Sequence, residues 1–172
     1  MICKERGFAM FGFLTLGSVL AGLDLTCKRV IEAQADEDFP REPAWGKGYI
    51  QLYKNHNYGF SFGVLKNNPL VERIPLCLTS GIGGAWFYLM GTKGRILEKL
   101  ALTLTLAGGI SNLYDRMTRG YVVDYFCIKW KALKRVVLNL GDLCIFAGAV
   151  LTMAAVVIGL IKDSRRKKNE TV

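Results

Sequence analysis

The sequence predicts an α-helical integral membrane protein with four transmembrane helices. The chain has 172 residues, of which 51% are hydrophobic and 22% charged, so the two kinds must be segregated along it. Apolar residues gather in four stretches, at roughly residues 7–28, 70–90, 97–115 and 140–161. Each stretch is close to the ~20 residues that a helix needs to cross ~30 Å of hydrocarbon. Four spans in so short a chain predict a single membrane-embedded domain, residues 1–172, with both termini on one side.

The first stretch has an alternative interpretation, because a short apolar run after Lys4 and Arg6 is also typical of a signal peptide. The residues Leu23-Asp24-Leu25-Thr26-Cys27 resemble a lipoprotein cleavage box, although Asp24 and Thr26 fit such a box poorly. Three more spans follow, so we expect an uncleaved first helix. Small residues recur at four-residue spacing in the spans, which favours close helix packing in lipid; the pairs are Gly17 and Ala21, Ser18 and Gly22, Ser80 and Gly84, and Gly108 and Asn112.

The net charge of +9 is explained by membrane topology, and no nucleic-acid partner is expected. The basic segment KDSRRKK, residues 162–168, follows the fourth span, and basic residues next to a span favour the cytoplasmic side. Lys93 and Arg95, between the second and third spans, would share that side. Both termini are therefore predicted in the cytoplasm. The loop at roughly residues 116–138 is also basic, and in this orientation it faces outward, toward anionic headgroups.

A small antiparallel sheet is predicted in the two outer loops, roughly residues 31–69 and 116–138. Residues 49–53 and 58–62 alternate and are rich in aromatic side chains, as short strands are, and residues 54–57 between them predict a turn. Residues 122–126 are the candidate third strand. Residues 128–140 mix basic and apolar side chains, a pattern equally typical of an interfacial amphipathic helix and of a solvated loop.

Asp124 and Asp142 are the main candidates for chemistry. Each lies near a predicted membrane–water boundary, where a carboxylate is costly and by default indicates a functional site. Two carboxyl groups that meet cannot both ionise, so one keeps a proton while the other can activate water. The alternative is that the two aspartates cap helices or pair with nearby basic residues.

Further polar residues are predicted at the same outer level: Asp24, Lys28, Asn57, Gly59, Asn112, Arg116 and Asn139. Independent helix caps would be spread over both membrane faces, so this convergence indicates one shared site. Peptide hydrolysis by an aspartate pair suits these residues. Asn112 and Asn139 would hold a peptide backbone or orient the carboxylates. Arg116 would bond backbone carbonyls, and Asp24 with Lys28 would anchor the sheet.

Three other residue types yield weaker expectations. Asp115 is expected to form a structural salt bridge. The five cysteines have no CxxC spacing, so neither a disulfide framework nor a metal site is indicated. His56 is the single histidine, and a hydrated loop position is expected for it.

Five sequence blocks, in order, resemble those of bacterial lipoprotein signal peptidase (signal peptidase II), an intramembrane aspartic endopeptidase family. AGGISNLYDR (107–116) resembles its GGAxGNxxDR block, GYVVDY (120–125) its GxVVDF block, and LNLGD (138–142) its FNxAD block. NYGFSF (57–62) is similar to NxGxAF, and the segment 24–28 to DQxxK. The departures noted are Leu25, Ser61, Leu138 and Gly141. Gly141 is predicted to loosen the turn beside Asp142, because glycine weakens a helix start.

The resemblance implies four transmembrane helices, a small extracytoplasmic sheet and an interfacial helix. It implies cleavage of prolipoprotein signal peptides just before the diacylglyceryl-modified cysteine, with Asp124 and Asp142 catalytic and no metal or organic cofactor. The supporting residues would be Asp24, Lys28, Asn57, Gly59, Asn112, Arg116 and Asn139. Prolipoproteins and membrane lipids are the expected partners of a monomer in the bacterial cytoplasmic (inner) membrane, with its active site near the extracytoplasmic face.

Two rival hypotheses keep the same helices. A non-catalytic paralogue would bind lipoproteins or lipids and would tolerate loss of either aspartate. A proton-coupled carrier would use the acids as a relay and would need polar residues along the whole length of its helices. The inner halves of the four stretches are almost wholly apolar, which argues against the carrier.

Overall fold

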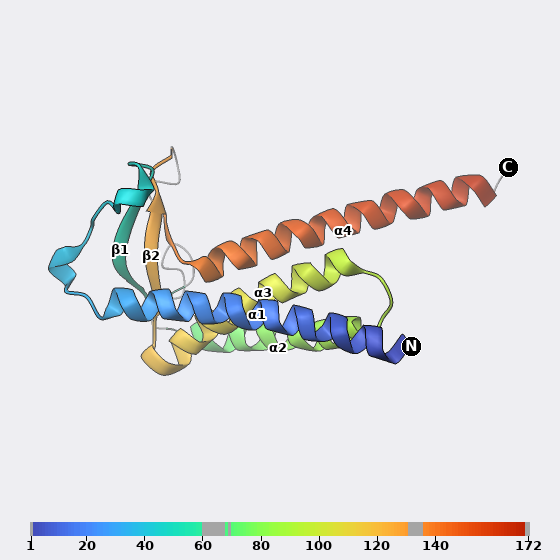
Figure 1. Ribbon diagram of the computed structural model, residues 1–172, viewed down its shortest axis with the longest axis horizontal. Coiled ribbons are helices and arrows are strands. Elements are labelled where there is room, and N and C mark those ends of the chain that lie inside the picture. Colours follow the sequence, from blue (N-terminus) through green and yellow to red (C-terminus); the bar gives the residue numbers. More distant parts are fainter. Residues whose placement is uncertain (1, 60–67, 69, 131–135, 171–172) are drawn as a thin grey trace.

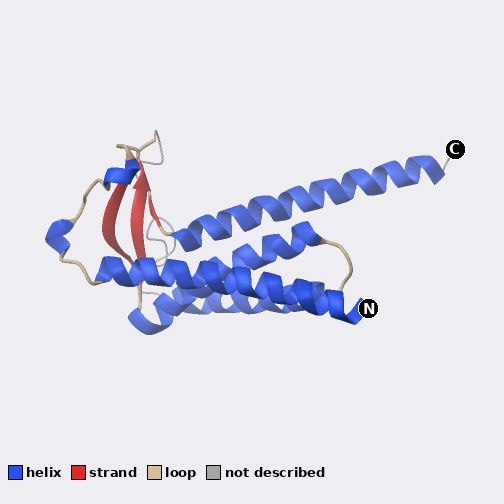
Figure 2. Ribbon diagram, in the orientation of Figure 1, coloured by secondary structure: helices blue, strands red, loops and turns tan. Residues whose placement is uncertain are grey.

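Four long helices form a bundle with a small sheet at one end in the computed structural model of the chain (Figure 1; Figure 2). The helices are α1 (Ile2–Glu32), α2 (Leu70–Met90), α3 (Ile96–Arg119) and α4 (Leu140–Glu170). Both chain termini lie at the end of the bundle away from the sheet, and α4 diverges from the other helices toward its C-terminus. The structure describes residues 2–59, 68, 70–130 and 136–170.

The four helices follow the four predicted apolar stretches, and α2 has the predicted bounds. Within the described residues, two segments are long and apolar enough to cross a membrane, Met10–Glu32 and Leu140–Asn169. The third helix is more polar, since it has Glu98 and Lys99 in its first turn and Asp115 and Arg116 near its end. The helical part of the fold prediction is therefore confirmed, whereas passage of α2 and α3 through a membrane stays a prediction.

The sheet has three antiparallel strands in the order β1 (Ile50–Asn57), β2 (Val122–Ile128) and β3 (Val137–Leu138). The turn predicted at residues 54–57 is wrong. These residues belong to β1 because they pair with the start of β2, Asn55 opposite Asp124 and Asn57 opposite Val122. The only irregularity among the described pairs of β1 and β2 is a register shift between Leu52 and Asn55. Of the second predicted strand, residues 60–62 lie outside the described residues.

The interfacial helix predicted over residues 128–140 is not found in the described part of that segment. Ile128 ends β2, Val137–Leu138 form β3, and Leu140 begins α4. Residues 131–135 lie outside the described residues. The short strand β3 pairs with Phe126 and Cys127 of β2, and this pairing brings the start of α4 next to the sheet.

Close packing of α3 against α4 depends on glycine. A Cβ atom at Gly108 would lie 2.1 Å from the carbonyl oxygen of Gly141, and one at Gly148 would lie 2.2 Å from Oγ1 of Thr105. The predicted packing role of Gly108 is confirmed. For Gly22 and Gly84 that role is wrong, because a Cβ atom at either would meet nothing within 4 Å.

Replacement of Gly108 by alanine is therefore expected to force α3 and α4 apart. Overpacking of this kind costs about 1–3 kcal/mol of unfolding free energy. We expect Gly108→Ala to lower the unfolding temperature in detergent, while Gly84→Ala leaves it unchanged or raises it slightly because alanine favours helix. Equal unfolding temperatures for the two variants would contradict the close α3–α4 contact.

Candidate active site

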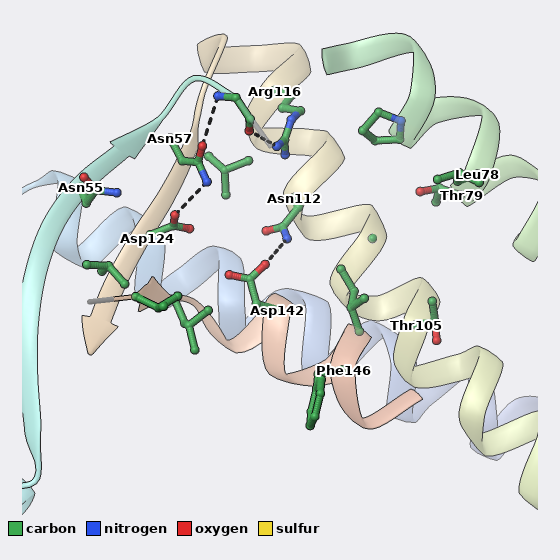
Figure 3. A pocket seen from close by; sticks show the side chains of 18 of the residues that line it. Asn55, Asn57, Leu78, Thr79, Thr105, Asn112, Arg116, Asp124, Asp142 and Phe146 are labelled. Carbon is green, nitrogen blue, oxygen red and sulfur yellow. Dashed lines mark hydrogen bonds between the residues drawn. The ribbon is translucent and has the colours of Figure 1, made fainter. Parts of the chain in front are cut away.

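Asp124 and Asp142 face one cavity of about 860 Å³ between the sheet and helices α2, α3 and α4 (Figure 3). Asp124 comes from β2, and Asp142 comes from the first turn of α4. At the sheet end the lining includes polar side chains as well as Val122 and Val137. Farther along, the walls are mostly apolar and come chiefly from α2 and α4, with Leu78, Ile82, Ile145 and Phe146 among the lining residues.

Asp124 is 3% exposed and accepts hydrogen bonds from two asparagine amides. Asn57 Nδ2 donates to its Oδ2 at 3.1 Å, and Asn139 Nδ2 donates to its Oδ1 at 2.8 Å. Strand pairing explains the first contact, since Asn57 at the end of β1 lies two residues from Asn55, which pairs with Asp124 on β2. Burial, together with the charge of Asp142, raises the pKa of Asp124 to about 7.

Asp142 is held by a third asparagine and by the start of its own helix. Asn112 Nδ2 donates to its Oδ1 at 2.9 Å. The backbone N–H of Asn139 donates to Oδ2 at 3.2 Å, and the backbone N–H of Asp142 donates to Oδ1 of Asn139 at 2.8 Å. This reciprocal pair is a capping box. Asp142 thus caps α4, as the alternative interpretation held, and faces the cavity as well.

Asn112 and Asn139 both form hydrogen bonds with the carboxylates, as the second of the two roles predicted for them requires. The side chain of Asn139 is fully buried and contacts both members of the pair, donating to Asp124 and accepting from the backbone of Asp142. One asparagine therefore fixes the strand-borne and the helix-borne carboxylate relative to each other.

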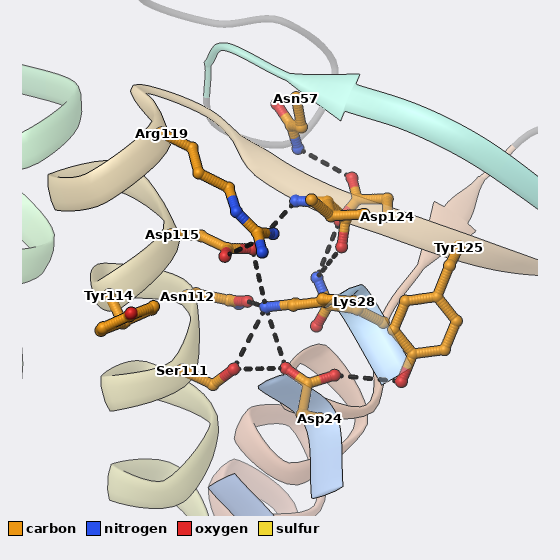
Figure 4. A network of polar contacts seen from close by, with 12 residues as sticks. Asp24, Lys28, Asn57, Ser111, Asn112, Tyr114, Asp115, Arg119, Asp124 and Tyr125 are labelled. Atoms are coloured by element: carbon orange, nitrogen blue, oxygen red, sulfur yellow. Dashed lines mark hydrogen bonds and ion pairs between the residues drawn. The ribbon is translucent and has the colours of Figure 1, made fainter. Parts of the chain in front are cut away.

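A buried ammonium group, that of Lys28, lies among Asp24, Asn112 and Asp115 (Figure 4). Lys28 is 0% exposed, and its Nζ lies 2.9 Å from Asp24 Oδ2 and 3.4 Å from Asp115 Oδ2. The same Nζ donates to Asn112 Oδ1 at 2.7 Å. Asp115 also pairs with Arg119 at 3.0 Å and accepts the backbone N–H of Val123 at 3.1 Å, so it has the structural ion pairs expected of it.

Gly59 and Arg116 close the site on the side of the loop that follows β1. Arg116 donates from Nη2 to the carbonyl oxygen of Gly59 at 2.9 Å, which is the kind of contact predicted for it. The backbone N–H of Gly59 donates to Asn57 Oδ1 at 3.1 Å. All the supporting residues predicted from the sequence therefore lie in one connected set around the two aspartates.

Two site residues were missed, Ser111 and Tyr125. Ser111 Oγ donates to Asp24 Oδ2 at 2.6 Å, and the hydroxyl group of Tyr125 donates to Asp24 Oδ1 at 3.0 Å. Their signal was visible in the sequence: Ser111 stands where the GGAxGNxxDR block has Gly, and Tyr125 stands where GxVVDF has Phe. A hydroxyl group at an apolar position next to a functional motif indicates an added hydrogen bond.

The hydrated loop position expected for His56 is wrong. His56 lies within β1, and its Nε2 is 2.7 Å from Glu32 Oε1 at the end of α1. Its ring centroid lies 4.2 Å from that of Tyr121. Among the residues that the structure describes, no group of three His, Cys, Asp or Glu side chains could hold a metal ion, and none of Cys27, Cys77, Cys127 and Cys144 forms a disulfide bond.

A comparison of the sequence with profiles of protein families identifies the family of the chain. The profile described as Signal peptidase (SPase) II matches residues 16–158. The chain belongs to the signal peptidase II family. It is therefore a peptidase and a hydrolase, as the five sequence blocks implied.

Curated relatives and solved structures agree with this assignment. The lipoprotein signal peptidase of Streptococcus pneumoniae is 28% identical over 137 residues, which is 80% of this chain and 86% of the relative. That of Haemophilus influenzae is 26% identical over 169 residues, 95% of this chain and 92% of the relative. A solved bacterial membrane enzyme shares the fold, with a TM-score of 0.70 and 21% identity over 91% of each chain.

In this member of the signal peptidase II family, the surroundings of Gly141 explain why a glycine precedes Asp142. A Cβ atom at Gly141 would lie 2.9 Å from Asp24 Oδ2 and 3.0 Å from Asn139 Oδ1. It would also lie 3.2 Å from Asn112 Oδ1. The capping box holds this turn. Gly141 is therefore explained by the space that these three oxygen atoms need, and not by the loosening predicted for it.

We expect Gly141→Ala to reduce the peptidase rate, because the added methyl group displaces oxygen atoms of residues that orient the aspartates. A misplacement of this order costs about tenfold to a hundredfold in rate. Gly159→Ala is the matched control, since it lies on the same helix and a Cβ atom there meets nothing within 4 Å. A normal rate for Gly141→Ala, measured as initial velocity in detergent, would show that the polar network tolerates a shift.

Proposed function

We propose that this protein is an intramembrane aspartic endopeptidase that removes the signal peptide of prolipoproteins by cleaving before the diacylglyceryl-modified cysteine. The observation that carries the proposal is the pair of aspartates, Asp124 and Asp142, which face one cavity and are held by three asparagine amides. The signal peptidase II profile and relatives named as lipoprotein signal peptidases support the substrate class.

The aspartate pair supplies both the base and the acid that peptide hydrolysis needs. The ionised carboxylate accepts a proton from water, whose oxygen attacks the scissile carbonyl carbon. The protonated carboxyl group polarises the carbonyl oxygen, and a proton reaches the leaving amine when the tetrahedral intermediate collapses. A pKa of about 7 for Asp124 keeps it protonated for about half of the time at neutral pH, so the pair can hold one proton.

The surfaces of the four helices support the proposed membrane placement. Each helix exposes large apolar side chains, for example Phe11 on α1, Phe87 on α2, Ile110 on α3 and Phe146 on α4. Residues of this kind are stable against hydrocarbon and costly in water. Residues 7–28, 70–90, 97–115 and 140–161 are thus the four spans of one membrane-embedded domain, with residues 31–69 and 116–138 outside them.

The orientation has the termini in the cytoplasm and the active site near the extracytoplasmic face of the bacterial inner membrane. Both termini lie at the end of the bundle opposite the sheet, and the basic end of α4 suits the cytoplasmic side. The apolar walls of the cavity from α2 and α4 suit the signal peptide, and the acyl chains of the substrate remain among membrane lipids. The enzyme acts as a monomer and needs no cofactor for this chemistry.

Replacement of either aspartate by asparagine is expected to abolish cleavage. Loss of an acid or base costs about 10²–10⁴-fold in rate. The assay is cleavage of a diacylglyceryl-modified prolipoprotein peptide by the purified protein in detergent, with the products identified by mass. Asp36→Asn is the control, because Asp36 is 85% exposed and pairs with Lys54, away from the cavity. Cleavage at the wild-type rate by the Asp124→Asn or the Asp142→Asn variant would refute the catalytic role of the aspartate pair. No cleavage by a folded wild type would favour the non-catalytic paralogue.

The stability of the protein should depend on pH through Asp124. Its pKa is about 7 in the folded state against an ordinary value of 3.8, so the folded state binds more protons between these values. Stability must therefore fall as pH rises through this window, by at most about 1.4 kcal/mol for each pH unit. We expect the unfolding temperature of Asp124→Asn to fall less between pH 4 and pH 7 than that of the wild type or of Asp36→Asn. Parallel curves would contradict the raised pKa.

A further inference from the structure

The hydroxyl group of Tyr125 connects three elements of the site. Tyr125 follows Asp124 on β2, and because side chains alternate along a strand, it points to the opposite face, toward α1. Its hydroxyl group donates to Asp24 Oδ1 on α1 at 3.0 Å (Figure 4). The same hydroxyl group accepts from the backbone N–H of Leu140 at 3.1 Å. Tyr125 is 8% exposed, so these bonds are shielded from water.

The bond to Leu140 ties the strand of one aspartate to the helix of the other. Leu140 is the first residue of α4 and lies two residues before Asp142. The first backbone N–H groups of a helix have no partner within the helix. The hydroxyl group of Tyr125 satisfies this one, and in doing so it fixes the first turn of α4 against β2.

A second route joins Tyr125 to Asp142 through side chains. Asp24 Oδ2 accepts from Ser111 at 2.6 Å and lies 2.9 Å from Lys28 Nζ. The ammonium group of Lys28 donates to Asn112 Oδ1 at 2.7 Å. Asn112 in turn donates to Asp142 at 2.9 Å. Both routes from Tyr125 therefore end at the carboxylate that opposes Asp124.

We infer that Tyr125 is a positioning residue that sets the separation of Asp124 and Asp142 through its bonds to Asp24 and Leu140. Ser111 assists by fixing the carboxylate of Asp24, to which Tyr125 is bonded. This inference rests on the proposed function, because it needs the two aspartates to act as a catalytic pair. With phenylalanine at position 125, the buried Oδ1 of Asp24 and the N–H of Leu140 both lose this hydroxyl partner. The first turn of α4 then shifts to recover solvation.

The test is Tyr125→Phe, which removes one oxygen atom and leaves the ring in place. We expect kcat to fall about tenfold, as the loss of a hydrogen bond in a catalytic assembly predicts, with KM changed by less than about twofold. As the carboxylates separate, the repulsion between them weakens and the pKa of Asp124 falls. The alkaline limb of the kcat profile therefore moves to lower pH. The charged groups that face this pair, Lys28, Asp24, Asp115 and Arg116, remain present in the variant.

Tyr121→Phe is the matched control. The hydroxyl group of Tyr121 also donates to a carboxylate of α1, Glu32 Oε2 at 3.2 Å, and Tyr121 directly precedes β2. Its described hydrogen bond does not reach α4, and Tyr121 does not line the cavity. We expect the kcat and pH profile of this variant to match those of the wild type.

Ser111→Ala provides a second test of the inference, which can be used if Tyr125→Phe does not fold. Loss of the Ser111 hydroxyl group loosens Asp24, so kcat should fall about threefold and the alkaline limb should move in the same direction. Wild-type kcat and pH profiles in the folded variants would overturn the inference, even with a lower unfolding temperature, since that result indicates a purely structural role. The Asp124→Asn and Asp142→Asn enzymes in the same assay keep the two questions apart. Activity that those variants retain, or a wild type that does not cleave, refutes the proposed function.

Discussion

The buried ammonium group of Lys28 is the interaction on which the arrangement of the helices and the sheet depends. A buried charge is stable only when it is paired, and loss of one partner of a buried ion pair costs about 3–5 kcal/mol. Lys28 on α1 is paired with Asp24 on its own helix and Asp115 on α3. These two carboxylates accept the Tyr125 hydroxyl group and the Val123 backbone N–H from β2. One charge centre thus holds α1, α3 and the strand that carries Asp124.

Among the described residues, three neutral asparagine amides donate hydrogen bonds to the aspartate pair, and this has a chemical consequence. Asn57, Asn112 and Asn139 orient Asp124 and Asp142 with amide N–H groups, which add no positive charge. A cation in direct contact with either carboxylate would favour its ionised form and oppose retention of a proton. Lys28 instead has Asp24 and Asp115 as its carboxylate partners, which keeps its charge close to the pair without binding it. A shared proton and a fixed geometry are therefore compatible in one site.

The helices and the site residues could be predicted from the sequence because their signals are local. Each helix follows a largely apolar stretch, and most of the polar site residues lie near the ends of those stretches that the topology places together. The extent of β1 could not be predicted, since Lys54-Asn55-His56-Asn57 has the composition of a turn and becomes a strand only by pairing with β2, far away in the sequence. The contact of His56 with Glu32 depends on that pairing and was missed for the same reason.

Three departures from the quoted family blocks meet at one carboxylate, and together they have a physical logic that none has alone. Ser111 and Tyr125 add hydroxyl groups that bond the two oxygen atoms of Asp24. Gly141 lacks the methyl group that would lie 2.9 Å from one of those oxygen atoms. An alanine at position 141 would require Asp24 Oδ2 to shift, so the glycine gives space to the two added hydrogen bonds. The departure at position 141 is thus part of one hydrogen-bonded arrangement around Asp24, which supports the proposed active site.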